Sequence, residues 1–136
     1  MTEAKEQLVR SWLTKAQHDL ASARVLAANT PPLLDTAIYH CQQSAEKAVK
    51  GYLVFCDHEF ERVHDMEVLI RSAVSHTTAF SAWVEVGRQL TPYARMFRYP
   101  GFVTGPSKEQ FDWAISAAEG LYNFVLSLLP HALWPE

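Results

Sequence analysis

The chain has 136 residues, of which 49% are hydrophobic and 20% are charged, and this is the ordinary composition of one globular domain. A chain of this length buries about two-thirds of its unfolded surface, so its stability requires neither a disulfide nor a metal. The net charge of −3 argues against non-specific nucleic-acid binding by the whole surface, although it leaves room for a local basic site. We therefore predict a single domain over residues 1–136.

The first two predicted helices cover most of residues 2–55. Apolar residues recur at steps of three and four over Thr2–Ala28, which places them on one face of a helix. Pro31-Pro32 ends that helix, because proline lacks an amide proton and clashes with the preceding turn. Leu33–Phe55 repeats the pattern, so we expect one packing face and one polar face there. The polar face carries Gln42, Gln43, Glu46, Lys47 and Lys50, in which Glu46 and Lys50 have the spacing of a helical ion pair.

Three further helices are predicted after a polar loop. His64-Asp65 begins the third, because Asp65 can cap the free amides of the following turn. A fourth covers residues 78–90 and is interrupted by Thr91-Pro92, with Pro92 suited to a short restart. The last begins at the capping box Ser107–Gln110 and is closed by Pro130. Because no segment alternates like a strand, we predict an all-α protein, an antiparallel up-and-down bundle of four to five helices.

The sequence also indicates a cytoplasmic protein without a membrane segment. Met1–Arg10 contains no apolar run of the kind found in a secretion signal, and Leu121–Leu129 is too short to span a bilayer. Cys41 and Cys56 would be separated by roughly 22 Å along the second predicted helix. A disulfide needs Cα atoms within about 7 Å, so we expect two buried thiols in a reducing compartment.

Positive charge is concentrated in one connection of the chain. Residues 86–108 contain no aspartate or glutamate and four cations, whereas the rest of the chain has eight basic and fifteen acidic residues. Arginine binds phosphate with two hydrogen bonds and aromatic rings stack on bases, so this pattern is typical of a site for a nucleotide or single-stranded RNA. The alternative is structural, with Arg98 paired to a carboxylate and the rings packed under the bundle. The cations are Arg88, Arg95, Arg98 and Lys108, and the interleaved aromatic residues are Tyr93, Phe97, Tyr99 and Phe102.

Four segments resemble the HEPN domain, a nucleotide-binding family of higher eukaryotes and prokaryotes. The most specific is the second predicted helix, because residues 43–50 match that family's Q-x-A-E-K-A-x-K pattern. The first helix contributes Ala16-Gln17-His18-Asp19-Leu20, and His64-Asp65 stands where the family begins its third helix. Arg98-Tyr99-Pro100-Gly101 is similar to the Arg-Tyr-Pro turn that precedes the family's final helix. The resemblance covers most of the chain.

The resemblance implies a bundle of four or five helices that is commonly dimeric. Such domains are often encoded beside a small nucleotidyltransferase, in pairs that resemble toxin–antitoxin modules. Many are metal-independent ribonucleases with an Arg-x(4–6)-His motif near the start of the last helix. The present chain departs from that pattern, because its last helix contains no histidine. Its one pair at this spacing, Arg71 and His76, falls at the end of the third predicted helix instead.

The histidines add no prediction of a metal site. His64 is either a catalytic base or, beside a helix cap, a structural hydrogen-bond donor. His18, His40 and His58 have no partner at a metal-ligand spacing in the sequence, and there is no C-x-x-C pair. The sequence also lacks a phosphate-binding glycine loop and a nucleophile elbow.

We therefore expect a non-catalytic subunit that binds a nucleotide, RNA or a nucleotidyltransferase partner, as a homodimer. One alternative is a divergent HEPN ribonuclease or toxin that uses Arg98, His64 or the Arg71/His76 pair. Another is a homodimerising helical scaffold without a ligand. We assign no catalytic residue, metal or cofactor. The polar residues of the second helix either line a cleft beside the Arg-Tyr-Pro turn or form a solvated face. The candidate ligand-binding residues are Arg95, Arg98, Tyr99, Gln43, Glu46, Lys47, Lys50 and His64.

Overall fold

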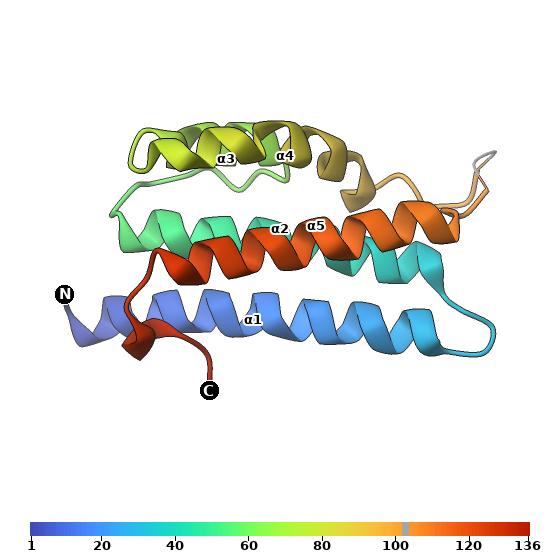
Figure 1. Cartoon of the computed structure of the whole chain (residues 1–136), viewed down its shortest axis with the longest axis horizontal. Helices are drawn as coiled ribbons and strands as arrows, with labels where there is room; N and C mark the ends of the chain where they lie inside the picture. The colour runs from blue at the N-terminus through green and yellow to red at the C-terminus, as the bar shows by residue number, and fades with distance from the viewer. Residues whose placement is uncertain (102–103) are drawn as a thin grey trace.

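Helices stacked in three layers make up the molecule (Figure 1). The computed structural model describes residues 1–101 and 104–136, and in these ranges all regular structure is helical. The helix α1 (Glu3–Ala28) forms one outer layer, and α2 (Leu34–Phe55) and α5 (Lys108–Ser127) lie beside each other in the middle. The other outer layer contains α3 (Met66–Val74) and α4 (Val84–Leu90). The predicted all-α bundle is thus confirmed.

Side chains at three predicted helix starts satisfy backbone amides that the helix leaves free. The hydroxyl of Thr2 accepts from the amide of Lys5 at 3.1 Å, and the carboxylate of Asp65 accepts from the amide of Glu67 at 3.0 Å. Ser107 and Gln110 form the predicted capping box, with bonds of 2.8 and 3.1 Å. These local signals explain why the starts of α1, α3 and α5 could be read from the sequence.

The predicted helix over residues 78–90 is only partly α-helical. Thr78–Trp83 forms the 3₁₀-helix η1, and the α-helix α4 begins after it at Val84. The tighter turn accompanies the burial of Phe80, whose ring lies 4.8 Å from that of Tyr52 and 4.9 Å from that of Phe124. Pro92 restarts the chain as predicted, in the short 3₁₀-helix η2 (Thr91–Ala94). A third such helix, η3 (His131–Leu133), follows α5.

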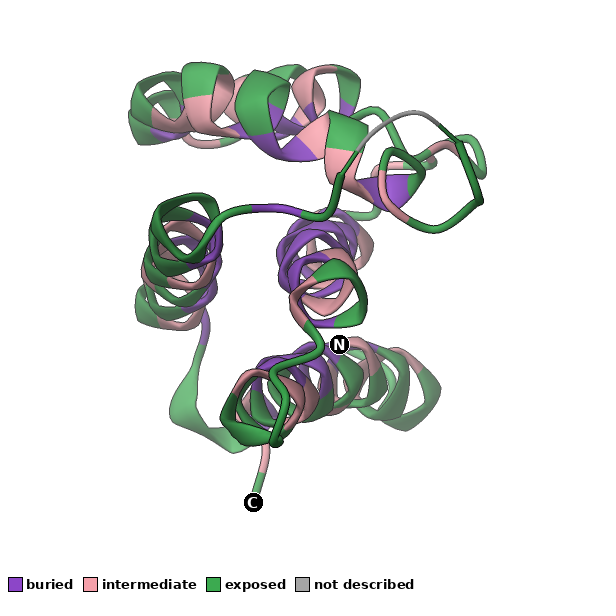
Figure 2. Cartoon of the chain, turned by 90° about the vertical axis from the view of Figure 1, so that its right-hand side faces the viewer, coloured by how far each residue is buried: buried purple, intermediate pink, exposed green. Residues whose placement is uncertain are grey.

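The helix α2 is the centre of the packing, because α1, α5, α3 and η2 all contact it. Figure 2 shows it as the mostly buried helix between the outer layers. Of the two alternatives for the polar residues of this helix, the solvated face does not hold for most of them, since neighbouring helices cover the side that carries the amide and charged groups. The polar side chains that are buried there are Gln42, Gln43, Glu46 and Lys50.

Both cysteines were expected to be buried, and this holds for Cys41 but only partly for Cys56. Cys41 is buried in the core of α2, and burial raises the pKa of its thiol to about 12. Cys56 caps the end of α2 and is only half-buried. Within residues 1–101 and 104–136, no helix combines the length and apolar character of a membrane span.

Candidate functional site

A row of buried polar side chains runs along α2 and is centred on Glu46. This carboxylate is 3% exposed, and its Oε1 lies 2.8 Å from Nδ1 of His64. Lys50 donates to its Oε2 at 3.0 Å, and Gln42 donates to Oε1 at 3.1 Å. The amide of Gln43 in turn donates to Gln42 at 2.7 Å. Each buried charge therefore has a partner, which is the condition for keeping ions inside a core.

The Lys50 ammonium is held by aromatic rings as well as by Glu46. Its nitrogen lies 5.8 Å from the ring centre of Trp12 and 5.6 Å from that of Phe60. Rings attract a cation through their negative faces, and the attraction is strongest where water is excluded. Lys50 is thus fixed inside the protein and does not point into a cleft.

Lys47 belongs to a second polar cluster between α2 and α1. Its ammonium lies 2.6 Å from Oδ2 of Asp19, and Nδ1 of His40 lies 2.7 Å from the other oxygen. A carboxylate can only accept, so His40 donates from Nδ1 to Asp19. The cluster joins α1 and α2, the two longest helices, through Asp19.

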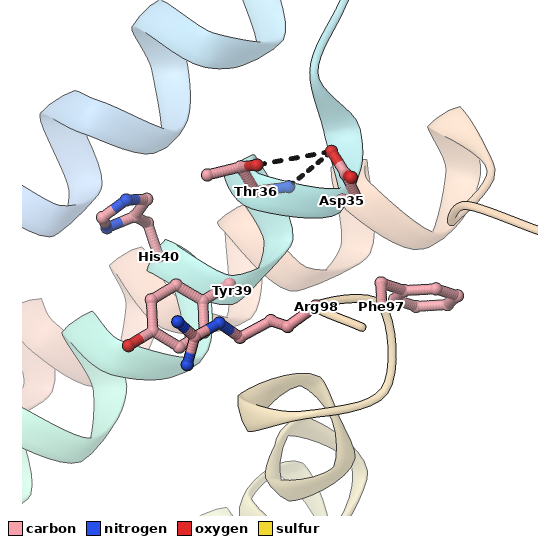
Figure 3. Close-up of a pocket in the computed structure, with 6 residues that line it drawn as sticks. All are labelled: Asp35, Thr36, Tyr39, His40, Phe97 and Arg98. Atoms are coloured by element: carbon pink, nitrogen blue, oxygen red, sulfur yellow. Dashed lines mark hydrogen bonds between the residues drawn. The ribbon is translucent and has the colours of Figure 1, made fainter. Parts of the chain in front are cut away.

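η2 and the residues after it form a tight turn that places Arg98 against α2. The amides of Arg95 and Met96 donate to the carbonyl of Pro92 at 3.1 and 2.8 Å, and the amide of Arg98 donates to that of Arg95 at 3.1 Å. The guanidinium of Arg98 then lies over the ring of Tyr39, with its Cζ 4.1 Å from the ring centre (Figure 3). We call residues 91–98 the arginine turn.

A pocket of about 330 Å³ lies between α2 and the arginine turn. Figure 3 shows that Arg98 and Tyr39 form one side of it, with Asp35 and Thr36 at the first turn of α2. The carboxylate of Asp35 accepts from the amide of Thr36 at 2.8 Å. The lining of this Tyr39 pocket consists of Asp35, Thr36, Tyr39, His40, Phe97 and Arg98.

A second pocket, of about 460 Å³, is lined by the arginine turn and the loop before α3. His64 reaches it with half of its side chain exposed, while its Nδ1 donates inward to Glu46. The other ring nitrogen, Nε2, is then an acceptor when the imidazole is neutral. Two arginines, Arg62 and Arg95, line the same pocket. We call it the His64 pocket.

The cations of the basic segment divide into paired and unpaired groups. Arg88 pairs with Glu67 at 3.0 Å and with Glu85 at 2.5 Å, and Lys108 pairs with Asp112 at 2.6 Å. In the part of the chain that the structure describes, neither Arg95 nor Arg98 has a carboxylate within ion-pair distance. The ion pair of the structural alternative, between Arg98 and a carboxylate, is therefore not observed there.

The same holds for Arg62, which has no ion pair among residues 1–101 and 104–136. The arginines that line the two pockets without an ion pair are thus Arg62, Arg95 and Arg98, a set that differs from the four cations of the basic segment. Arg62 was missed because it lies in the loop before α3, and only the fold brings that loop to Arg95.

The structure brings together only some of the predicted site residues. Arg95 and His64 line the same pocket, and Glu46 is hydrogen-bonded to His64 from the interior. Arg98 lines the other pocket. Tyr99 is 70% exposed and lines neither, and Phe102 lies outside the described residues. Tyr39 was missed as a site residue, although it lies one helical turn before Gln43 in the most specific motif. Gln43, Lys47 and Lys50 form contacts inside the bundle.

The pair Arg71 and His76 is not assembled as a motif. Arg71 bonds to Glu67 within α3 at 2.9 Å. Nε2 of His76 instead lies 2.8 Å from Nδ1 of His58. Each side chain is thus held by a different neighbour.

These features define a class of protein: a helical bundle whose central helix carries a buried polar row beside an arginine turn. The family model of the HEPN domain matches residues 9–128. The chain belongs to the HEPN family.

Two solved structures are similar over nearly their whole length. TT1696 from Thermus thermophilus has 24% identity and a TM-score of 0.78, and the match covers 89% of this chain and 98% of that one. ST0689, an archaeal HEPN homologue, has 26% identity and a TM-score of 0.69, with 88% and 96% covered. No curated protein matches the chain.

Proposed function

We propose that this chain, as a single HEPN domain over residues 1–136, is a non-catalytic subunit that binds a nucleotide or the end of an RNA strand at the arginine turn. It works with a small nucleotidyltransferase in a pair that resembles a toxin–antitoxin module. The main support for this binding site is that Arg62, Arg95 and Arg98 line two pockets and form no ion pair with a carboxylate among the described residues.

The Tyr39 pocket supplies the contacts that a phosphorylated ligand needs. Stacking on Tyr39 fixes the plane of the Arg98 guanidinium, and its N–H edge can then donate two bonds to a phosphate. Phe97, whose ring is stacked on that of Tyr93, borders the same pocket, and Asp35 offers an acceptor for an amino group. The His64 pocket adds Arg62 and Arg95 for a second phosphate.

Binding is tested by titrating the protein with ATP, GTP and a short single-stranded RNA while its melting temperature is recorded. We expect one of them to raise the melting temperature, and Arg98→Ala to abolish that rise. The melting temperature without ligand should barely change, because the Arg98 side chain lies on the surface. Arg24→Ala is the matched control, since it removes the same charge from an ion pair with Glu119 outside both pockets.

Two results contradict the proposed site. The first is no shift with any ligand, and the second is a shift that survives in Arg98→Ala. A strong drop in the melting temperature of the ligand-free variant would assign Arg98 a structural role instead. The proposed partner rests on the family resemblance, and co-purification with a small nucleotidyltransferase encoded beside this chain tests it.

A ribonuclease is the second candidate, and the bond between Glu46 and His64 favours it. A buried carboxylate that fixes Nδ1 leaves Nε2 facing a pocket with two arginines, an arrangement suited to proton transfer beside a phosphate. Induced expression in a bacterial host separates the candidates. Growth arrest that His64→Gln relieves supports the ribonuclease, whereas harmless expression supports the binding subunit.

Homodimerisation remains part of the proposal. Of the four tryptophans, Trp83 and Trp134 pack against the chain's own core, and Trp12 contacts Phe60. Trp113 is the one that stays exposed, and Met96 and Tyr99 are exposed apolar residues as well. Sedimentation equilibrium of the purified protein tests the dimer, and a strict monomer would contradict it.

A further inference from the structure

Two histidines from separate segments face each other at the end of the bundle opposite the Tyr39 pocket. His58 follows α2, and His76 follows α3. Nδ1 of His58 and Nε2 of His76 lie 2.8 Å apart, and the two rings are nearly perpendicular, with an interplanar angle of 85°. One of these nitrogens carries the shared hydrogen and the other offers its lone pair. Neither histidine belongs to the pockets beside the arginine turn.

The backbone holds both histidines in place. The amide of His58 donates to the carbonyl of Leu53 at 2.9 Å, and the preceding Asp57 adopts a positive φ of 56° that turns the chain back. The amide of His76 donates to the carbonyl of Ala73 at 3.0 Å. A hydrogen bond between the hydroxyls of Tyr52 and Thr77 joins the same two segments. The ring nitrogens therefore meet because the fold presents them.

We propose that His58 and His76 form a binding site for a borderline divalent metal ion such as Zn²⁺, with Nδ1 of His58 and Nε2 of His76 as the ligands. Zinc–imidazole bonds of about 2.0–2.1 Å in a tetrahedral site place two nitrogens about 3.3 Å apart. To admit the ion, the nitrogens separate by about 0.5 Å and the two side chains rotate so that both lone pairs point at the metal. The metal takes the place of the shared hydrogen, and water fills the remaining positions.

The two histidines would be the only protein ligands that the described residues supply, so the proposed site is weak and exchangeable. Among the described residues no third histidine, cysteine or carboxylate joins these two in a group that could hold a metal. The nearby carboxylate of Asp57 is paired with Lys5 at 2.9 Å, and the Cys56 thiol faces Tyr52. Neutral imidazoles prefer Zn²⁺, Cu²⁺ and Ni²⁺ over Mg²⁺ and Ca²⁺, which prefer oxygen ligands. A bound ion would join the ends of α2 and α3 and so stabilise the packing of the outer layer on the central helix.

Titration calorimetry with ZnCl₂ tests the site, using untagged full-length protein freed of metal with EDTA and dialysed into a buffer that does not chelate. We expect one Zn²⁺ to bind per chain, with a rise in melting temperature, and no binding of Mg²⁺. His58→Gln and His76→Gln should each abolish the Zn²⁺ binding and the rise in melting temperature. His18→Gln is the matched control and should leave both intact, because His18 is exposed on α1.

Melting curves in EDTA establish that the variants are folded before zinc is added. Both histidines are at least partly exposed, so these curves should match that of the parent protein. No zinc binding to the parent protein would overturn the assignment, as would binding that survives in either variant. Loss of binding in His18→Gln as well would place the metal elsewhere and overturn it too.

Discussion

The Glu46 carboxylate receives hydrogen bonds from a lysine and a glutamine of its own helix and from a histidine of the loop before α3. Sequence reasoning identified Glu46 and Lys50 as a helical ion pair of a surface, where such a pair contributes only a few tenths of a kcal/mol. Inside the bundle the same pair has a different energetic role. Water can no longer replace a missing partner, so each ion depends on the other.

We expect Glu46→Ala to lower the free energy of unfolding by about 3–5 kcal/mol, because it leaves the buried ammonium of Lys50 without a counter-ion. Arg24→Ala, which breaks an exposed pair with Glu119, should cost no more than about 1 kcal/mol. Guanidinium unfolding followed by circular dichroism measures both. Equal losses would mean that Lys50 is not confined by the packing as described.

At the scale of elements, α3 and α4 are joined by a charged contact around Glu67. Arg88 of α4 donates to both oxygens of this carboxylate, at 3.1 and 3.0 Å, and Arg71 of α3 donates at 3.0 Å. The hydrogen bonds from Arg88, followed by those from Arg71, lower the pKa of Glu67 from 4.5 to about 2. This is a contact between helices, and it explains why Arg88 does not contribute to the basic site.

The lowered pKa of Glu67 predicts an acid-dependent contribution to stability. A carboxyl with a lower pKa in the folded state stabilises the protein above the unfolded value near 4.5, and this contribution is lost as the pH falls toward 2. We therefore expect the stability difference between the parent protein and Glu67→Gln to be largest at pH 6 and to shrink between pH 4.5 and pH 2. In Arg88→Gln the loss should be smaller and complete at a higher pH than in the parent protein, because the folded-state pKa of Glu67 is lowered less without Arg88. Denaturant unfolding at several pH values checks this, and a difference that stays constant down to pH 2 would contradict it.

Close packing of α4 on α3 depends on Gly87. A Cβ atom at this position would lie 2.5 Å from Cδ1 of Ile70, too close without a shift of that side chain, and 3.2 Å from Cβ of Met66, which is a tight contact. Gly87→Ala gains about 1 kcal/mol of helix propensity but costs about 1–3 kcal/mol of overpacking, so we expect a net loss of stability. Gly120→Ala in α5 meets only the ring edge of Trp83, at 3.1 Å, and should be nearly neutral. Thermal melting of the two variants compares them, and equal melting temperatures would contradict the difference.

At the scale of the whole molecule, the helices could be predicted from the sequence, but their arrangement in layers could not. Caps, prolines and apolar spacing are local, so the bounds of α1, α2, α3 and α5 could be predicted. The burial of the polar side chains along α2 could not be predicted in this way, because it requires the outer layer to fold over that helix. The candidate site shows the same limit. The turn that contains Arg98 could be recognised from the sequence. The stacking of Arg98 on Tyr39 and the approach of Arg62 to Arg95 could not, because they join segments far apart in the chain.

The layered arrangement predicts where a bound ligand changes the dynamics of the chain. Residues 41–53 of α2 are almost wholly buried, so their amides should exchange with deuterium slowest whether or not a ligand is present. A nucleotide in the two pockets should slow exchange in residues 35–40, 62–65 and 91–98, which line them and come from three separate segments. In Arg98→Ala the added protection should disappear from all three, and in Arg24→Ala it should persist. Hydrogen–deuterium exchange by mass spectrometry measures this, and protection confined to the outer face of α1 would place the ligand elsewhere.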